Sequence, residues 1–392
     1  MKGWIKSIRQ SKGLIFLSIT DGAKDHQITI KEDCSVIGVF KVGASFIATG
    51  VDSVTPKGQP EFLASTITII GTSDDEYPIQ SKYHSDEFLR TIPELRGRAR
   101  AFQATWKIRH HLTQAIHRTL EDFGFYQYYT PIITHADCEG AGDTFSVKSE
   151  WLDEKLTVSG QLHGEVGMMS LGKIYTFSPC FRAEKSMTKK HLSEFWMIEP
   201  EIAFFDLKQT VEFTEKFIKD VFVYVLSKSE YEFKQLGIDD SHIKSLLSID
   251  WKVISYKEIC EKFGLEFGLD ISSELEKKIV DFYKSPVFIT HYQKDLKPFY
   301  MKKDSDVAYC FDLIFPEVGE VVGGSQREES YDILKDSIEK SGIDLEKMKW
   351  YLSTRKWGSV PHSGFGLGFE RLLMYIVKAQ KIHDVIPFPV SY

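Results

Sequence analysis

Hydrophobic and polar positions alternate along the first part of the chain, up to about residue 72, in the way that half-buried β-strands require. Turn signals such as Asp21-Gly22 and Pro56-Lys57-Gly58 interrupt the alternation. The segments between such signals predict five short strands: Leu14-Phe16, His26-Ile30, Ser35-Phe40, Ser45-Val51 and Glu61-Ile70. Several short strands in so short a segment predict a small β-barrel.

After residue 72 the periodicity changes. A polar stretch broken by Pro78 and Pro93 indicates a hinge. Apolar residues then recur at helical spacing from Ala99 to Phe123, and Gly124 ends the run. We therefore expect an N-terminal domain, a hinge and a larger second domain, with bounds 1–72, 73–98 and 99–392.

The second domain mixes strand-like and helical patterns. Strands are predicted at Tyr126-Thr134, Leu156-Val158, Ile174-Phe177, Phe195-Phe204 and Ala308-Phe315. The segment 207–303 is mostly helical in pattern and is interpreted as an insertion, and a last helix is predicted from Glu370 to about Ala379. Neighbouring hairpins, without strict βαβ alternation, predict an α+β domain with a central antiparallel sheet flanked by helices.

Composition narrows the class of protein. The chain is 42% hydrophobic and 27% charged, and it has no apolar run near the roughly 18 residues that cross a bilayer. Its start, Met1 to Phe16, lacks the features of a signal peptide. Five scattered cysteines without a Cys-x-x-Cys pair argue against a disulfide framework or a structural zinc site. We expect a soluble, cytoplasmic protein without a membrane partner.

The distribution of charge gives a sign of nucleic-acid binding only in the predicted barrel. The net charge of −7 gives no global sign of nucleic-acid binding. Residues 1–72, however, contain eight Lys/Arg against six Asp/Glu, while the rest of the chain is acidic. A barrel of the OB type with a local basic excess suits a nucleic-acid-reading module, but an oligomerisation barrel or a barrel for another ligand fits the composition equally well.

One glycine-rich segment imitates a phosphate-binding loop. Gly167 to Lys173 matches the P-loop pattern until its last position, where Ile174 replaces Ser or Thr and removes the hydroxyl that would bind Mg²⁺. The segment also lies between two predicted strands and lacks the strand-loop-helix context. We do not expect it to bind phosphate.

A more informative run extends from Tyr175 to Glu201. Arg182 follows a predicted strand, a basic loop comes next, and Phe195 begins a second strand. A guanidinium for a phosphate, loop cations for the remaining charge and a ring for a base together suit a nucleotide. An ordinary surface hairpin with a buried phenylalanine is the alternative interpretation.

This run resembles motif 2 of the class II aminoacyl-tRNA synthetases, in the aspartate/asparagine/lysine subgroup. Motif 1 is resembled by the long helix ending at Gly124-Phe125 followed by Tyr129-Thr130-Pro131-Ile132-Ile133, and motif 3 by the glycine-rich run from Gly364 to Arg371. Four further segments resemble the asparagine enzymes of this subgroup: Cys138–Asp143, Leu156–Gln161, Gly319–Glu328 and Gly358–Gly364.

The resemblance implies an ATP- and Mg²⁺-dependent ligase that converts L-asparagine to its adenylate and transfers it to tRNA(Asn). Arg182, Arg371 and Glu320 are the implied catalytic residues. Arg182 and Glu184 would bind the α-phosphate and the adenine side, Phe195 would stack on the base, and Arg371 would meet the γ-phosphate. The full implied ATP set is Arg182, Glu184, Lys190, His191, Leu192, Phe195, Glu320, Gly368 and Arg371.

The resemblance also implies an amino-acid pocket. Glu139, Ser159 and Gln161 would hold the α-ammonium, while Arg327 and His362 would face the substrate side chain. The aspartate enzymes carry a lysine at the position of Gly164, and the loss of that cation favours a neutral amide over a carboxylate.

Three other assignments come from the resemblance. Asp312 and Glu320 form a carboxylate pair suited to Mg²⁺ bound against ATP oxygens, although two solvated acids would be the commoner case. Phe16, Gln27 and Glu61 fall where the family reads anticodon bases, and Phe16 could equally be a core residue. The motif 1 helix and strand would form a homodimer interface.

The chain departs from the asparagine enzymes near its C-terminus. Val390 stands where an arginine is usual, and His383 and Lys190 also replace common arginines. Two other functions therefore remain open: a paralogue that activates asparagine, or makes it from aspartate, without charging tRNA, and a regulatory or tRNA-binding module with a dead site. The implied phosphate-binding residues are intact, which argues against the dead site.

Overall fold

The computed structural model describes residues 1–135, 144–185 and 188–391. The chain divides into two compact units, Met1–Ala99 and a second unit that begins at Arg100. No helix within the described residues is both long enough and apolar enough to span a membrane.

The first unit is a closed five-stranded barrel in the order β1-β2-β3-β5-β4. Its strands are β1 Lys2–Ser11, β2 Leu14–Thr20, β3 Asp25–Ile37, β4 Ser45–Val54 and β5 Pro60–Gly71. All neighbours are antiparallel except β3 and β5. The predicted OB-type barrel is confirmed, since a closed five-stranded barrel is the architecture of that fold.

The pattern misjudged how the barrel strands are divided. Strand β1 was not predicted, because only Gly3 and Ile5 of its ten residues are buried and the alternation is short. Conversely, two predicted strands are halves of the single strand β3, whose pairing with β5 shifts register between Ile30 and Ser35. The segment 73–98, predicted as a hinge, carries helices α1 Asp86–Arg90 and α2 Pro93–Arg96.

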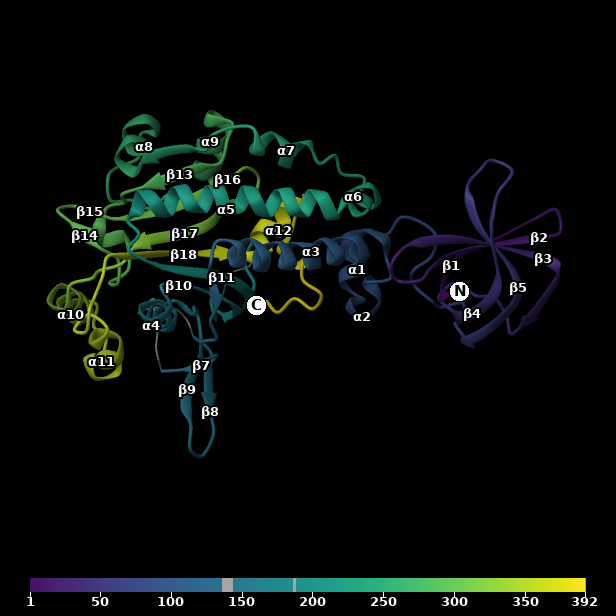
Figure 1. Cartoon of the computed structure of the whole chain (residues 1–392), viewed down its shortest axis with the longest axis horizontal. Helices are drawn as coiled ribbons and strands as arrows, with labels where there is room; N and C mark the ends of the chain where they lie inside the picture. The colour runs from purple at the N-terminus through teal and green to yellow at the C-terminus, as the bar shows by residue number, and fades with distance from the viewer. Residues whose placement is uncertain (136–143, 186–187, 392) are drawn as a thin grey trace. The chain divides into compact units, whose positions relative to one another are not determined.

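The second unit is built on an eight-stranded sheet in the order β12-β13-β16-β17-β18-β11-β10-β6 (Figure 1). Only the two outermost pairs, β12 with β13 and β10 with β6, are parallel, so the predicted central antiparallel sheet is confirmed. The strands are β6 Tyr126–Gln127, β10 Lys173–Phe181, β11 Glu194–Ala203, β12 Lys252–Ser255, β13 Val287–Thr290, β16 Cys310–Phe315, β17 Gly319–Gln326 and β18 His362–Gly368.

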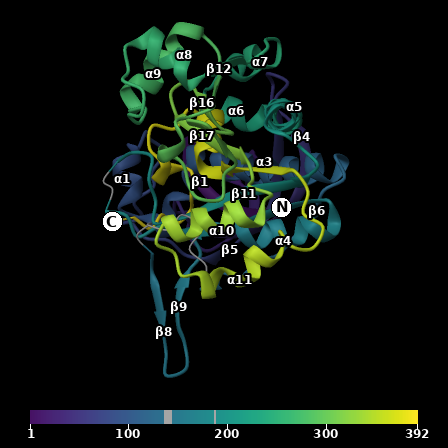
Figure 2. The same cartoon turned by 90° about the vertical axis from the view of Figure 1, so that its left-hand side faces the viewer.

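Helices cover this sheet. The long helices α3 and α5 lie side by side, while α4 packs on β10 and β11 and contacts α11 (Figure 1). The helices are α3 Arg100–Asp122, α4 Gln161–Leu171, α5 Leu207–Lys228, α6 Glu230–Leu236, α7 Ser241–Leu247, α8 Tyr256–Phe263, α9 Ser273–Tyr283, α10 Tyr331–Lys340, α11 Leu345–Ser353 and α12 Phe369–Val377, with short 3₁₀ turns η1 Lys294–Leu296 and η2 Ile382–Asp384. The segment 207–303, predicted to be mostly helical, holds α5 to α9 and also strands β12 and β13, which extend the sheet (Figure 2).

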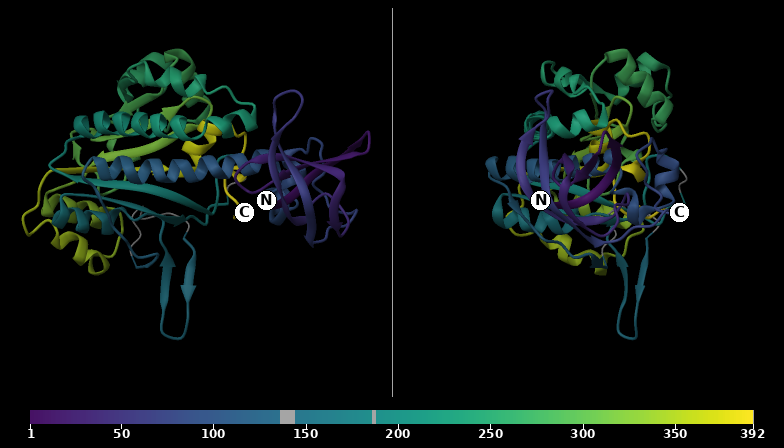
Figure 3. Two further views of the ribbon diagram at one scale, coloured as in Figure 1. Left: turned by 45° about the vertical axis from the view of Figure 1, so that its right-hand side comes forward. Right: turned by 90° about the vertical axis from the view of Figure 1, so that its right-hand side faces the viewer.

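Two small sheets lie outside the main one. A three-stranded sheet joins β7 Ile133–Thr134, β9 Asp153–Leu156 and β8 Ser146–Lys148, and a two-stranded sheet joins β14 Lys303–Asp304 and β15 Val307–Ala308. The β8–β9 hairpin projects away from the main sheet in every view (Figure 3). Trp151, near its tip, is 83% exposed.

Glycines let the central strands pack closely. A Cβ built at Gly324 in β17 would lie 2.5 Å from ring carbons of Phe311 and 2.7 Å from the Cβ of Phe365. Both phenylalanines are buried in the core of the second unit. The glycine therefore leaves room for two aromatic side chains that hold the sheet to its helices.

We expect Gly324→Ala to lower the free energy of unfolding by about 1–3 kcal/mol, because the new methyl group overpacks this aromatic cluster. The matched control is Gly368→Ala, whose Cβ would meet its nearest neighbours at an ordinary 3.8 Å. Chemical denaturation of the two variants measures the difference. Equal stability of both would contradict the packing argument.

Candidate active site

A cleft in the second unit opens between the β10–β11 hairpin, β17 and the joint of β18 with α12. All nine residues assigned from the sequence to ATP line it: Arg182, Glu184, Lys190, His191, Leu192, Phe195, Glu320, Gly368 and Arg371. Met197, Gly366, Glu370 and Ser391 are also among the lining residues. Residues that are nearly 190 positions apart in the sequence thus meet around one space.

The hairpin fixes the side of the cleft that holds Arg182. Strands β10 and β11 pair Cys180 with Phe195, and Arg182 follows directly, its backbone N–H donating to Ser193 O at 3.0 Å. The guanidinium carbon of Arg182 lies 5.4 Å from the centre of the Phe195 ring. A cation and a ring face therefore stand together at this wall, which suits a phosphate beside a base.

Arg371 enters the cleft from another element, the first turn of α12. Its Nη1 donates to Glu320 O at 2.7 Å and lies 3.9 Å from Glu320 Oε2, so the side chain spans from α12 to β17. The preceding residue, Glu370, is buried and accepts from Arg109 Nη2 at 2.7 Å and from Trp196 N at 2.9 Å. Burial raises the pKa of Glu370. These bonds tie α12 to α3 and β11 and thereby set where Arg371 stands.

Another acidic side chain, Glu276 of α9, lies beside the cleft residue Lys190 and was not assigned from the sequence. A Cβ at Gly319 would lie 2.5 Å from Glu276 Oε2 and 3.0 Å from Lys190 Nζ, so the two side chains meet there. Burial and the neighbouring Glu320 raise the pKa of Glu276 to about 7. Its position in a helix of the segment taken as an insertion gave no signal of this contact.

Asp312 and Glu320 lie close together on paired strands. A Cβ at Gly323 would be 3.2 Å from Glu320 Oε1 and 3.6 Å from Asp312 Oδ1, so the glycine leaves a space that both carboxylates border. Desolvation and Asp312 raise the pKa of Glu320, although 44% of its side chain is exposed. In the described residues no group of three or more metal-ligating side chains occurs. Two oxygen ligands with an open space fit Mg²⁺, which is usually bound by one or two carboxylates together with substrate phosphates.

Asp312 already has a cationic partner. Its Oδ2 accepts from Lys297 Nζ at 2.7 Å, and Lys297 lies 3.9 Å above the ring of Tyr292. Burial opposes the charge on Lys297, but Asp312 raises the lysine pKa above its usual value. A divalent cation at this pair would therefore compete with Lys297 for one carboxylate.

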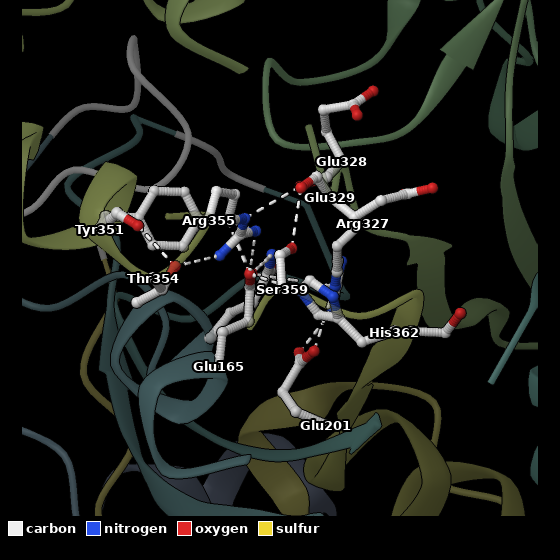
Figure 4. Close-up of polar contacts among 12 residues, drawn as sticks. Glu165, Glu201, Arg327, Glu328, Glu329, Tyr351, Thr354, Arg355, Ser359 and His362 are labelled. Carbon is white, nitrogen blue, oxygen red and sulfur yellow. Dashed lines mark hydrogen bonds and ion pairs between the residues drawn. The ribbon is translucent and has the colours of Figure 1, made fainter. Parts of the chain in front are cut away.

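Beyond the cleft lies a buried polar network that includes Arg327 and His362, two of the residues assigned to the amino acid (Figure 4). Its centre is Glu165 of α4, whose carboxylate accepts from Gln161 Nε2 at 3.2 Å and from His362 Nε2 at 3.1 Å. A second carboxylate, Glu201 of β11, is bound by Arg327 through Nη2 at 2.5 Å and Nε at 3.2 Å. Glu165 and Glu201 were not among the assigned residues.

Glu199 positions the loop before α4. It accepts from Ser159 Oγ, from Gly160 N at 2.8 Å and from Thr176 Oγ1 at 2.9 Å. The alternation of the Glu194–Ala203 strand could have identified both missed glutamates of β11, because residues two apart share one face of a strand. Phe195 and Met197 line the cleft, and Glu199 and Glu201 follow on the same face.

Gly164 lies against this network. A Cβ there would be 3.3 Å from Ile174 Cδ1 and 3.6 Å from Glu201 Cγ. Glu139, the remaining residue assigned to the α-ammonium, lies outside the described residues. The segment Gly167–Lys173 forms the end of α4 and the start of β10, without the strand-loop-helix geometry of a P-loop.

The C-terminal segment that departs from the expected pattern borders the cleft. Val390 O accepts from Ser193 N at 2.8 Å, and Ser391 lines the cleft and lies 3.1 Å from His383 Nε2. Lys190, at another departing position, is half-buried in the same cleft, and burial lowers its pKa.

In the first unit, the residues assigned to the anticodon share a face of the barrel. Gln27 Nε2 donates to Glu61 Oε2 at 3.4 Å, and Thr29 Oγ1 donates to the same oxygen. Phe16 pairs with Thr29 in the ladder of β2 and β3, and the Arg9 guanidinium lies 4.9 Å from the centre of the Phe16 ring. The ring is half-buried on this polar face, which argues against a role in the barrel core.

Comparison with known proteins agrees with this geometry. Residues 87–392 match the family of tRNA synthetases class II (D, K and N). The chain is 41% identical to the asparagine–tRNA ligase of Parabacteroides distasonis, over 99% of this chain and 93% of that protein. It is also 41% identical to the asparagine–tRNA ligase of Desulfotalea psychrophila, over 99% of this chain and 94% of that protein.

Solved structures of asparaginyl-tRNA synthetases are also similar to this chain. Asparaginyl-tRNA synthetase from Pyrococcus horikoshii, complexed with asparaginyl-adenylate, superposes with a TM-score of 0.93 at 30% identity, over 100% of this chain and 94% of that chain. The Entamoeba histolytica asparaginyl-tRNA synthetase, in complex with asparaginyl-adenylate, has a TM-score of 0.86 at 26% identity with the same coverage. The chain therefore belongs to the class II tRNA synthetases of the D, K and N group, and within that group to the asparaginyl-tRNA synthetases.

Proposed function

We propose that this chain is an asparagine–tRNA ligase, which activates L-asparagine with ATP and transfers it to tRNA(Asn). One observation supports this most strongly. Phe195 and Met197 line the cleft, and Glu199 and Glu201 on the same face of β11 belong to the buried polar network. The six residue steps from Phe195 to Glu201 span about 20 Å of strand, a length suited to a nucleotide joined to an amino acid.

The first step joins these two ends. An oxygen of the asparagine carboxylate attacks the α-phosphorus, a new O–P bond forms, and the bond to the bridging oxygen breaks so that pyrophosphate leaves with its electron pair. Arg182 and Arg371, which both line the cleft, would stabilise the charge that develops on the phosphates. Asp312 and Glu320 would hold Mg²⁺, which supplies further positive charge to the ATP oxygens. The protein provides position and charge without a covalent intermediate.

The second step needs no protein nucleophile. A hydroxyl oxygen of the terminal ribose of tRNA attacks the acyl carbon of the adenylate and forms the ester C–O bond. AMP leaves with the electrons of the broken C–O bond, and the hydroxyl proton is released to water. Phe16, Gln27 and Glu61 are proposed to read the anticodon, with the Phe16 ring as a stacking surface. The other ATP residues, Glu184, Lys190, His191, Leu192 and Gly368, are proposed to shape the nucleotide site from the cleft walls.

The amino-acid pocket is proposed at the buried network. Gln161 donates its amide N–H to Glu165, so its carbonyl oxygen remains the atom that can accept from the α-ammonium. Ser159 and Glu139 are proposed to share this role. Arg327 provides donors for the side-chain oxygen of asparagine, and Glu201 provides an acceptor for its NH₂ group. His362 is proposed to border the substrate side chain, with its two ring nitrogens facing Val360 O and Glu165.

A cytoplasmic homodimer is proposed as the working form. The segment after α3 exposes apolar side chains that a partner would cover, because Tyr129 is 83% exposed and Ile132 and Ile133 are 42% and 47% exposed. The alternative function, a paralogue that activates asparagine or makes it from aspartate without charging tRNA, is distinguished by assays of pyrophosphate exchange and tRNA charging on one preparation.

We expect Arg371→Ala to reduce asparagine-dependent ATP–pyrophosphate exchange by about 10²–10³-fold, because the site loses a cation aimed at the phosphates. Arg118→Ala, at an exposed position of α3, is the control for loss of an arginine. A folded Arg371→Ala protein with near-wild-type exchange would exclude this role.

Phe16→Ala is expected to lower tRNA charging by roughly tenfold or more, because a base-stacking contact contributes about 1–3 kcal/mol. Amino-acid activation should stay unchanged, since the cleft is untouched. Val54→Ala, at an exposed apolar position of the barrel, is the control. If charging by Phe16→Ala and by Gln27→Ala equals wild type, the ligase assignment stands and the anticodon site is wrong. If wild type activates asparagine but charges no tRNA, the paralogue is correct.

The dimer is tested by Ile133→Lys, which places a charge in the proposed interface and should shift the mass measured by light scattering from two chains to one. Val253→Lys serves as the control, because Val253 is equally exposed at 47% but lies on β12. A wild-type protein that is already a single chain would exclude the homodimer.

A further inference from the structure

Strands β16 and β17 and the segment after the turn η1 meet around the carboxylate of Asp312. Residues two apart on a strand share a face, so Asp312 lies on the same face of β16 as Cys310 and Ile314. A register shift between Leu313 and Ile314 places Glu320 opposite Ile314. Because directly opposite residues point to the same side of a sheet, this irregularity brings Glu320 onto the face of Asp312.

Lys297 reaches the same face from the segment that follows η1. Its Nζ donates to Asp312 Oδ2 at 2.7 Å and lies 3.9 Å from the centre of the Tyr292 ring. Its backbone is bound as well, because Lys303 Nζ donates to Lys297 O at 2.9 Å. The side chains of Lys297 and Asp312 are only 14% and 18% exposed. The ammonium group therefore engages one carboxylate oxygen and leaves the other, Oδ1, beside the open space at Gly323.

The other carboxylate at this space, Glu320, also has a cationic neighbour. Arg371 Nη1 lies 3.9 Å from Glu320 Oε2. With Lys297 beside Asp312, the two carboxylates are matched by two cations. A divalent ion that entered alone would be attracted by two negative charges and repelled by two positive ones. ATP changes this balance, because its triphosphate brings several negative charges and oxygen ligands of its own.

Glu276 and Lys190, the next pair along this side of the cleft, do not alter the balance. Glu276 Oε2 and Lys190 Nζ lie 2.5 and 3.0 Å from the position of a Cβ at Gly319. They add one acidic and one basic group, so Lys297 and Arg371 remain the cations beside the two proposed metal ligands.

We propose that Lys297 is a positioning residue that neutralises Asp312 in the free protein and so makes binding of a divalent ion depend on bound ATP. It holds Oδ2 and thereby keeps Oδ1 beside the space that Asp312 shares with Glu320. Once the triphosphate is bound, Asp312 Oδ1 and Glu320 share the ion with phosphate oxygens, while Lys297 stays on Oδ2. The inference rests on the proposed function only for the place of Mg²⁺ at these two carboxylates.

The test measures metal binding directly, with Mn²⁺ as the probe and electron paramagnetic resonance to quantify the free ion. Wild type and Lys297→Met are titrated without nucleotide. Methionine keeps an apolar side chain beside Tyr292 and removes the charge, so the dissociation constant for Mn²⁺ should fall by about tenfold or more relative to wild type. Damage to the packing alone would weaken the site, so a gain in affinity separates charge from structure.

Three further variants serve as controls. Lys219→Met removes a similar lysine outside the site, because Lys219 pairs with Glu215 at 2.6 Å and lies 5.7 Å from the centre of the Trp251 ring. It should bind Mn²⁺ as wild type does. Lys297→Arg keeps the charge and should remain as weak as wild type. Lys297→Met combined with Asp312→Asn should lose the gain, since the carboxylate that would bind the ion is removed.

A folded Lys297→Met protein whose affinity for Mn²⁺ equals that of wild type, or is weaker, would overturn the proposal. A gain that survives Asp312→Asn would overturn it too, because the ion would then bind elsewhere. If Lys297→Met does not fold, Lys297→Gln repeats the measurement, since glutamine keeps a hydrogen-bond donor for Asp312 without the charge.

Wild type decides if neither variant folds. Its affinity for Mn²⁺ is compared without nucleotide and with a non-hydrolysable ATP analogue, after subtraction of the Mn²⁺ that the analogue binds by itself. Binding that is tighter by about tenfold or more with the analogue supports the proposal. Equal affinity in the two states overturns it.

Failure of the proposed function is detected separately. Asparagine-dependent pyrophosphate exchange by wild type tests the ligase. The Mg²⁺ concentration that gives half-maximal exchange should rise in Asp312→Asn if the metal site is correct. If it rises but Lys297→Met gains no affinity for Mn²⁺, only the role of Lys297 is refuted. If it does not change, the proposed metal site is wrong and the inference falls with it.

Discussion

Buried charge is the constraint on which the catalytic unit depends. Glu165 and Glu201 are fully buried, and a buried carboxylate that loses its partner costs about 3–5 kcal/mol. Their partners come from α4, α11, the end of β17 and the start of β18. All these elements must therefore pack in their native positions, because the displacement of any one of them would leave a buried charge without its hydrogen bonds.

The pairing of the central strands places the buried carboxylates and the cleft residues of β11 along one extended face of that strand. Strand β11 pairs with β18 so that Met197 faces Gly368 and Glu201 faces Gly364. A Cβ at Gly364 would lie 2.4 Å from the Glu201 carboxylate, and one at Gly366 would lie 2.7 Å from Met197. Glycines on β18 thus leave room for the side chains of β11 at both ends. The same register sets the distance between the cleft and the buried polar network, which are the proposed sites for the nucleotide and the amino acid.

The barrel differs from the catalytic unit in that its charged side chains are not deeply buried. Its core is apolar, with Ile5, Leu17 and Ile28 fully buried, and its polar network is shallow and shared by a half-exposed face. Arg9 against the Phe16 ring and Glu61 beside Gln27 offer a cation, an aromatic surface and hydrogen-bonding groups on one side. Such a face can bind splayed bases without the burial that the catalytic unit needs.

The sequence by itself determined the elements and residues whose signals are local. Period-two alternation predicted a barrel, helical spacing predicted α3, and the runs around Arg182 and Arg371 indicated a nucleotide site whose nine assigned residues do line one cleft. These signals can be read from the sequence because the side-chain directions of a strand, a turn or a glycine-rich joint depend only on residues that are neighbours in the chain. The predicted division of the barrel strands was wrong, since β1 buries few residues and two predicted strands form β3.

Only the tertiary structure decided which distant charges meet. Glu165 and Arg355 are 190 positions apart, and nothing in either neighbourhood indicates the other. Glu276 could be recognised as a neighbour of Lys190 only once the chain had folded, because α9 lies far from both β17 and the β10–β11 hairpin in the sequence. The reason is physical. The free energy of a buried charge depends on every group around it in three dimensions, and the linear order of the chain does not contain those distances.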